Sequence, residues 1–268
     1  MLGWSINLFR IFGIQLSVHA SFVLLLAYAG WEGSLDGSGW PGMVESIFQV
    51  VLFFICVVLH ELGHSLTARR YGVKVPRILL MPIGGMAEFD RIPRQPSAEF
   101  IITINGPLVN FAIVLILWAV VGLPRGLLWN PQLSDSFFTR QAQILLCWNA
   151  VMGCFNLLPV FPMDGGRIFR AILATRLPYL RATFWAARIG QILAVLLVAT
   201  AIYIHWWMLA VLFGFIFMVG GAEYKTLLRR EQESAYWAEM AKRVAIPVKT
   251  SDYDEPPSPP PLIIHGPN

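Results

Sequence analysis

The sequence predicts an all-α polytopic membrane protein of about six transmembrane helices, with a small β-hairpin or re-entrant element after the second helix. Composition is the first reason. Of the 268 residues, 56% are hydrophobic and only 13% are charged, against roughly 45–50% and about 25% in soluble domains. Uninterrupted apolar stretches are the second. Residues 100–124 and 189–222 contain no Asp, Glu, Lys or Arg, and about 20 apolar residues suffice to cross a bilayer.

Six apolar segments are predicted to span the membrane, at residues 14–30, 43–67, 99–122, 141–163, 183–204 and 207–223. The last two share one apolar tract. We divide it at residues 205–207, where a histidine and two tryptophans suit a membrane interface and a tight reversal. Residues 73–93 combine β-branched residues, prolines and a Gly-Gly pair, a pattern that predicts the small sheet or re-entrant hairpin.

Charge distribution predicts the orientation of these spans. With both termini on one side, Arg125 and Arg140 are the only Lys or Arg residues placed on the opposite side. Because short cytoplasmic loops carry an excess of Lys and Arg, both termini are expected in the cytoplasm. The net charge of +4 then follows from topology and lipid, and no nucleic-acid partner is expected.

A metal-binding pattern lies near the end of the second span, where residues 60–64 read HELGH. On a helix, His60 and His64 are four residues apart and share one face, so both imidazoles can reach one Zn²⁺ at about 2.0–2.1 Å. Glu61 can reach a water molecule at the metal without ligating it, which suits a general base. Ionisable side chains inside a membrane are costly and tend to mark function.

A catalytic zinc needs a third protein ligand, and Asp164 is the candidate. It is the only acidic residue within residues 136–222. The second and fourth spans both run towards the cytoplasm, and Arg69 and Arg167 follow His64 and Asp164 by five and three residues. At about 1.5 Å per helical residue, both ligands lie within roughly 10 Å of the cytoplasmic face, so their depths match.

Three motifs together carry a family resemblance. They are HELGH at 60–64, Asn-Gly-Pro at 105–107 followed by Asn110, and NxxPxxPxDG at 156–165. With these motifs the chain resembles the site-2 protease family of intramembrane zinc metalloproteases. The resemblance covers the central core, residues 43–166, and the paired zinc motifs are highly specific.

The resemblance implies one zinc ion per chain held by His60, His64 and Asp164. It further implies that Glu61 activates water and that Asn156 assists the substrate or the transition state. The expected activity is hydrolysis of peptide bonds in single-span membrane proteins within the lipid bilayer, which releases a factor to the cytoplasm. A bacterial inner membrane is the expected location.

The domain organisation expected is compact. Residues 1–223 form the six-span protease domain, and residues 224–268 form a cytoplasmic helix followed by a Pro-rich disordered tail. Some members of the family carry a PDZ domain in a loop, but residues 123–140 are too few for one. Others carry a nucleotide-binding module after the last span, for which the tail has no room. Regulation is therefore expected from substrate availability or from a separate membrane protein.

The substrate helix must unwind before its carbonyls can be attacked, because its internal hydrogen bonds hide them. Pro159 and Pro162 interrupt the fourth span and open space beside Asp164. The hairpin at Gly84-Gly85 is expected to hold the unwound segment by strand addition.

Other interpretations stay open at this stage. A metal transporter also places His and Asp at membrane depth, and a non-catalytic scaffold could bind helices with the same residues. Glu61 within HExxH disfavours both, and no inverted repeat typical of many transporters is present. Asn156 has an alternative as an interhelical contact, and the role of His19 is undecided. Asn105 and Asn110, with Gly106 and Pro107, are expected to permit close helix packing beside the site and to orient the zinc ligands indirectly.

Overall fold

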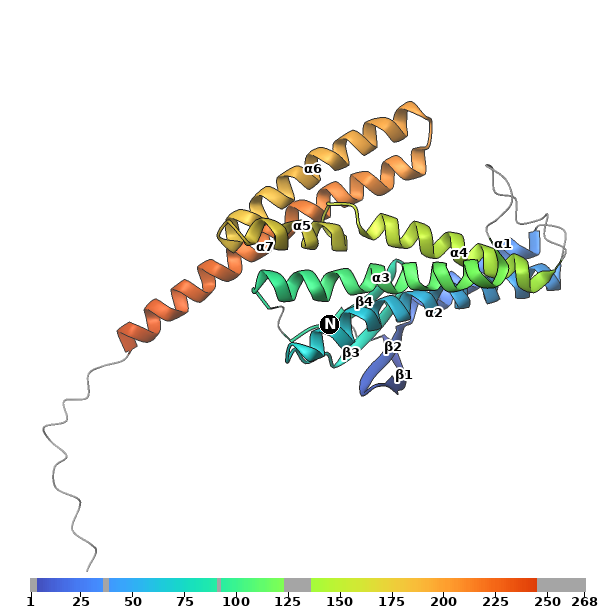
Figure 1. Ribbon diagram of the computed structural model, residues 1–268, viewed down its shortest axis with the longest axis horizontal. Coiled ribbons are helices and arrows are strands. Elements are labelled where there is room, and N and C mark those ends of the chain that lie inside the picture. The colour runs from blue at the N-terminus through green and yellow to red at the C-terminus, as the bar shows by residue number, and fades with distance from the viewer. Residues whose placement is uncertain (1–3, 36–38, 91–92, 123–135, 245–268) are drawn as a thin grey trace, which may run out of the picture. The chain divides into compact units, whose positions relative to one another are not determined.

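The computed structural model describes residues 4–35, 39–90, 93–122 and 136–244 (Figure 1). The chain divides into two compact units, residues 1–225 and 226–268. The helices of the structure are α1 Ser21–Leu35, α2 Trp40–Arg70, α3 Pro96–Val121, α4 Phe137–Asn156, α5 Asp164–Ala174, α6 Tyr179–Tyr203 and α7 Trp207–Val244. The chain is thus mostly helical, as predicted.

Four of the described helices are long and apolar enough to cross a membrane, namely α2, α3, α6 and α7 as far as Met240. These agree with the second, third, fifth and sixth predicted spans. The division of the last apolar tract is confirmed, because α6 ends at Tyr203, His205 has a positive φ of 59° and α7 begins at Trp207. The predicted disordered tail lies outside the described residues from 245 onwards, and the boundary at residue 223 stays a prediction.

The structure contains one four-stranded sheet, with two strands before α1 in the chain and two after α2. Its strands are β1 Ser5–Ile11, β2 Ile14–His19, β3 Arg77–Met81 and β4 Gly84–Glu88. The order is β1-β2-β3-β4, with the outer pairs antiparallel and β2 parallel to β3. The predicted hairpin within residues 73–93 is therefore confirmed as β3 and β4, whereas β1 and β2 were not expected.

The predicted first span, residues 14–30, is wrong as a continuous helix. Residues 14–19 form β2, whose Ile14 and Leu16 pack in the same core as Val57 and Leu62 of α2. Hydropathy alone does not separate a buried strand from a helix. Here pairing with β3 decides the outcome, because it satisfies the backbone groups of the segment.

Strand β2 and helix α1 together follow the length of α2. At the C-terminal end of α2, Arg69 donates a hydrogen bond to the carbonyl of Phe12, just before β2. Further along, Phe22 of α1 stacks edge-on against Phe54. Near the start of α2, a Cβ on Gly33 would lie 2.5 Å from the Gly42 carbonyl oxygen. The segment that runs alongside α2 is therefore made of a strand and a short helix.

The predicted fourth span, residues 141–163, is also wrong at its C-terminal end. Helix α4 ends at Asn156, and residues 157–163 form turns before α5 begins at Asp164. Two prolines in this segment, Pro159 and Pro162, cannot donate helical hydrogen bonds. Asp164 is consequently the first residue of a new helix and not the last residue of the fourth span.

Candidate metal centre

Helices α2 and α5 bring His60, His64 and Asp164 together at one point. The two imidazole Nε2 atoms are 3.1 Å apart. Oδ2 of Asp164 lies 3.3 Å from Nε2 of His60 and 3.1 Å from Nε2 of His64. All three residues are buried, with exposed fractions of 5%, 4% and 8%. The sequence-predicted ligand set is thus one compact triangle of donor atoms, the only such group of three found in the described part of the chain.

The triangle fits a zinc ion on two grounds. Tetrahedral zinc with ligand bonds of about 2.0–2.1 Å separates neighbouring donor atoms by about 3.3 Å, and the three separations lie close to this value. Two imidazoles and one carboxylate are also typical of catalytic zinc sites, which keep a fourth position open.

The tautomer of each imidazole is set by a partner at Nδ1. Nδ1 of His64 lies 2.9 Å from the Ile102 carbonyl oxygen, which can only accept, so Nδ1 carries the proton. Nε2 then carries no proton, and its lone pair is available to a metal ion. Such second partners orient a ligating histidine and fix its tautomer.

For His60 the same result comes from a chain of three hydrogen bonds across α3 and α4. Asn149 donates from Nδ2 to the Leu145 carbonyl at 2.8 Å, so its Oδ1 accepts from Nδ2 of Asn110 at 2.9 Å. Oδ1 of Asn110 therefore accepts from Nδ1 of His60 at 2.6 Å. Asn110 and Asn149 are both fully buried. The expected support from Asn110 is confirmed, whereas Asn149 was missed.

Two glycines allow α2 and α3 to approach closely at the site. A Cβ on Gly63 would lie 2.6 Å from the Asn105 carbonyl oxygen, and one on Gly106 would lie 2.2 Å from Nε2 of His64. Side chains at these positions would separate the helices or displace the imidazoles. The predicted packing role of residues 105–110 is therefore confirmed at Gly106.

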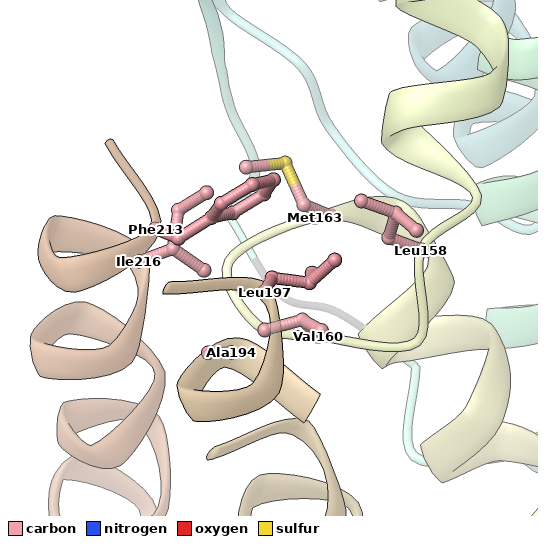
Figure 2. A pocket seen from close by; sticks show the side chains of 7 residues that line it. All are labelled: Leu158, Val160, Met163, Ala194, Leu197, Phe213 and Ile216. Carbon is pink, nitrogen blue, oxygen red and sulfur yellow. The ribbon is translucent and has the colours of Figure 1, made fainter. Parts of the chain in front are cut away.

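The segment that precedes Asp164 is closely packed against α5 and α6. A Cβ on Gly165 would meet the Leu158 carbonyl oxygen at 2.2 Å, and one on Gly190 of α6 would meet Cα of Val160 at 3.1 Å. Figure 2 shows an apolar pocket beside this segment, lined by Leu158, Val160 and Met163 with Ala194, Leu197, Phe213 and Ile216 of α6 and α7. It leaves no room for a water molecule, so the segment carrying Asp164 is backed by dry side chains.

Glu61 lies beside β4. A Cβ on Gly85 would be 2.7 Å from Cγ of Glu61 and 3.1 Å from Cγ1 of Val57. The strand backbone therefore contacts the predicted general base directly, and Glu61 is only partly buried. Asn156, the other predicted catalytic residue, is the last residue of α4 and is also partly buried.

The donor set and the adjacent glutamate have the composition of a catalytic zinc site. Residues 48–127 and 128–197 match the model of peptidase family M50. A zinc metalloprotease of Methanocaldococcus jannaschii is 43% identical over 201 residues, covering 73% of this chain and 53% of that protein. The chain thus spans about half the length of this relative.

A solved structure agrees with the sequence comparison. The site-2 protease from Methanocaldococcus jannaschii is 37% identical and superposes with a TM-score of 0.57, covering 82% of this chain and 95% of that one. The chain belongs to peptidase family M50. Its apolar helices and this structural match establish it as an integral membrane protein with the fold of a site-2 protease.

Proposed function

We propose that this protein hydrolyses peptide bonds in transmembrane substrates, with His60, His64 and Asp164 as the zinc ligands. The observation that carries the proposal is the buried triangle of donor atoms beside Glu61, formed by two helices far apart in the sequence. A structural cluster would not need both imidazoles to present unprotonated Nε2 atoms to a common point.

Each residue at the site has a chemical task. When bound, zinc polarises the scissile carbonyl and makes a water molecule more acidic. Glu61 takes the proton from the attacking water and delivers it to the leaving amine. The side-chain amide of Asn156 donates a hydrogen bond to the oxyanion that develops on the scissile carbonyl. Nδ1 of both histidines keeps its proton throughout, because its partners accept only.

The substrate segment is held as an added strand on β4. This strand is at one edge of the sheet, paired on one side with β3, and its other side carries no strand among the described residues. Gly85 places the strand against Glu61. An extended peptide paired with β4 would therefore bring its carbonyls past the general base, and main-chain hydrogen bonds would hold it without a fixed sequence.

The proposed topology has six traverses and both termini in the cytoplasm. The combined course of β2 and α1 along α2 supports it, because α1 alone has 15 residues and a length of about 22 Å, less than the roughly 30 Å of a bilayer core. Counting this composite traverse keeps the N-terminus on the same side as Arg69 and Arg70. A bacterial inner membrane is the proposed location.

The proposed substrates are single-span membrane proteins whose cleavage releases a factor to the cytoplasm. A separate membrane protein is the proposed regulator. Family membership supports a membrane-protein substrate in a lipid bilayer, and the position of the site near the basic cytoplasmic end of α2 supports release on that side.

The test compares purified wild type with Glu61→Gln in detergent or liposomes, measuring zinc content and cleavage of a panel of single-span substrates. The expected result is equal zinc content with cleavage lost in the variant. Cleavage retained in Glu61→Gln would refute the assigned base. Zinc flux into sealed liposomes that is equal in both proteins, without cleavage in either, would support a transporter instead.

A further inference from the structure

A second cluster of charges lies six residues beyond Asp164 on α5, outside the metal centre. Arg170 of α5 is 3% exposed and Glu99 of α3 is fully buried. Nε of Arg170 donates to Oε1 of Glu99 at 3.0 Å, and Nη2 donates to the same oxygen. Oε2 of Glu99 is buried without a hydrogen-bond partner in the described part of the chain. The buried carboxylate therefore depends on Arg170 for its compensation.

Arg170 also contacts each of the other elements around α5. Its Nη1 donates to Glu223 of α7 at 2.9 Å. The guanidinium lies over the rings of Phe161 and Tyr179, with 5.1 Å from Cζ to each centroid. Burial lowers the pKa of Arg170, but the neighbouring Glu99, Tyr179 and Glu223 side chains together outweigh this, so the pKa is raised and the side chain stays charged. One cation thus joins α3, α6, α7 and the turn segment that precedes Asp164.

The ion pair lies on the same face of α3 as the groups that support the imidazoles. Glu99, Ile102, Gly106 and Asn110 are spaced by three or four residues and are all buried, so they form one stripe. Glu99 therefore shares its stripe with the carbonyl that fixes His64 and with the amide that fixes His60.

The spacings along the two helices match. From Glu99 to Gly106 is seven residues, or about 10.5 Å along α3, and from Asp164 to Arg170 is six residues, or about 9 Å along α5. The helices α3 and α5 pack against each other. With Arg170 held at Glu99, an antiparallel α5 brings Asp164 level with Gly106, which is the depth at which the imidazoles contact α3.

We propose that Arg170 is a positioning residue that, through its buried ion pair with Glu99, holds Asp164 within ligand distance of His60 and His64. The inference rests on the proposed role of Asp164 as the third zinc ligand. Helix α5 has only 11 residues, so it has little length over which packing can fix its position along α3. The directional bonds of the guanidinium fork supply that restraint, and zinc ligands tolerate errors of only about 0.2 Å.

The test removes the bridge without leaving a buried charge. In the double variant Glu99→Gln/Arg170→Met both partners become neutral, a change that is often tolerated for buried ion pairs. Arg170→Lys keeps the charge and loses the fork. The matched control is Glu45→Gln/Arg140→Met, which removes a partly buried pair of 2.7 Å between α2 and α4, 15 residues before His60 and so about 22 Å along α2.

The measurements are zinc affinity of the full chain by chelator competition, the visible spectrum of the Co²⁺ form, and the unfolding temperature of the metal-free protein. We expect the double variant to bind zinc about 10–100-fold more weakly, the range found when supporting partners of a metal site are lost. Its Co²⁺ spectrum should also change. The zinc affinity of Arg170→Lys should lie between those of wild type and the double variant. The control should match wild type in zinc affinity and in its Co²⁺ spectrum.

A purely structural role would move only the unfolding temperature. Unchanged zinc affinity and an unchanged Co²⁺ spectrum in both the double variant and Arg170→Lys would overturn the proposal. If the double variant does not fold, Arg170→Lys alone decides by the same two readouts. Asp164→Asn serves as the reference variant. If it binds zinc with wild-type affinity, the assignment of Asp164 as a ligand fails. If it loses zinc while the Arg170 variants keep wild-type zinc affinity, only the positioning role is refuted.

Discussion

The most demanding test of the site geometry is a single methyl group at Gly106. A Cβ at this position would lie 2.2 Å from Nε2 and 2.3 Å from Cε1 of His64, and 2.9 Å from Cε1 of His60. Carbon contacts are normally about 3.5–4.0 Å, so an imidazole must move by more than about 1 Å or the helices must separate. Overpacking of this kind costs about 1–3 kcal/mol, which corresponds to a loss of zinc affinity of about 5–150-fold.

The assay is chelator competition on Gly106→Ala, with unfolding temperature measured alongside. The matched control is Gly214→Ala in α7, where an added Cβ meets nothing within 4 Å. Because alanine has a higher helix propensity than glycine by about 1 kcal/mol, the control should be unchanged or slightly stabilised with normal zinc affinity. Wild-type zinc affinity in Gly106→Ala would refute the described packing of the imidazoles on α3.

Three further predictions follow from the same contacts. Asn149→Leu should weaken zinc binding by about 10-fold, since Asn110 loses the partner that orients it; equal affinity would show that the hydrogen-bonded chain is not needed. Gly85→Val should lower kcat by about 100-fold with zinc affinity unchanged, because the side chain would displace Glu61; normal turnover would contradict the contact. Adding zinc at 100 times its Kd should stabilise the metal-free protein by about 2.7 kcal/mol and raise its Tm by about 5–10 °C. An unchanged Tm would argue against a link between zinc binding and folding.

Strand addition at β4 has a separate test by single prolines at residues 85–88. Proline removes one backbone N–H and is tolerated at an edge only where that group does not pair. At positions whose N–H faces away from β3, we expect turnover to fall while zinc content stays constant. Full activity at all four positions would exclude substrate pairing with this edge.

The cluster of His60, His64 and Asp164 could be predicted from the sequence because the information for it is local. HELGH places two histidines on one helical face, and Asp164 is the sole acid in a long apolar region. Arg69 and Arg167, which follow the two motifs, indicated that His64 and Asp164 lie at similar depths in the membrane. This argument from depth did not predict that α4 ends at Asn156 and that Asp164 begins a new helix. The two prolines in the segment are the only sequence signal of that break.

The parts that were missed depend on contacts between distant segments. Residues 14–19 read as the start of an apolar span, and only pairing with β3 makes them a strand. Asn149 is one of several amides in α4, with Gln141, Gln143 and Asn156, and its role emerges only when α3 places Asn110 opposite it. The available signal was its presence, since a polar residue within a membrane segment usually has a partner. Arg170 and Glu99 gave the same kind of signal, because each is a charged residue in an otherwise apolar part of the sequence and each therefore needs a partner.

The central claim is that two distant segments supply three ligands to one zinc ion. X-ray absorption at the zinc edge, on wild type and on Asp164→Asn, tests it directly. The account predicts two imidazole nitrogens and one carboxylate oxygen at about 2.0–2.2 Å in wild type, with loss or rearrangement of the zinc shell in the variant. A wild-type spectrum with sulfur at about 2.3 Å, or identical spectra from both proteins, would contradict it.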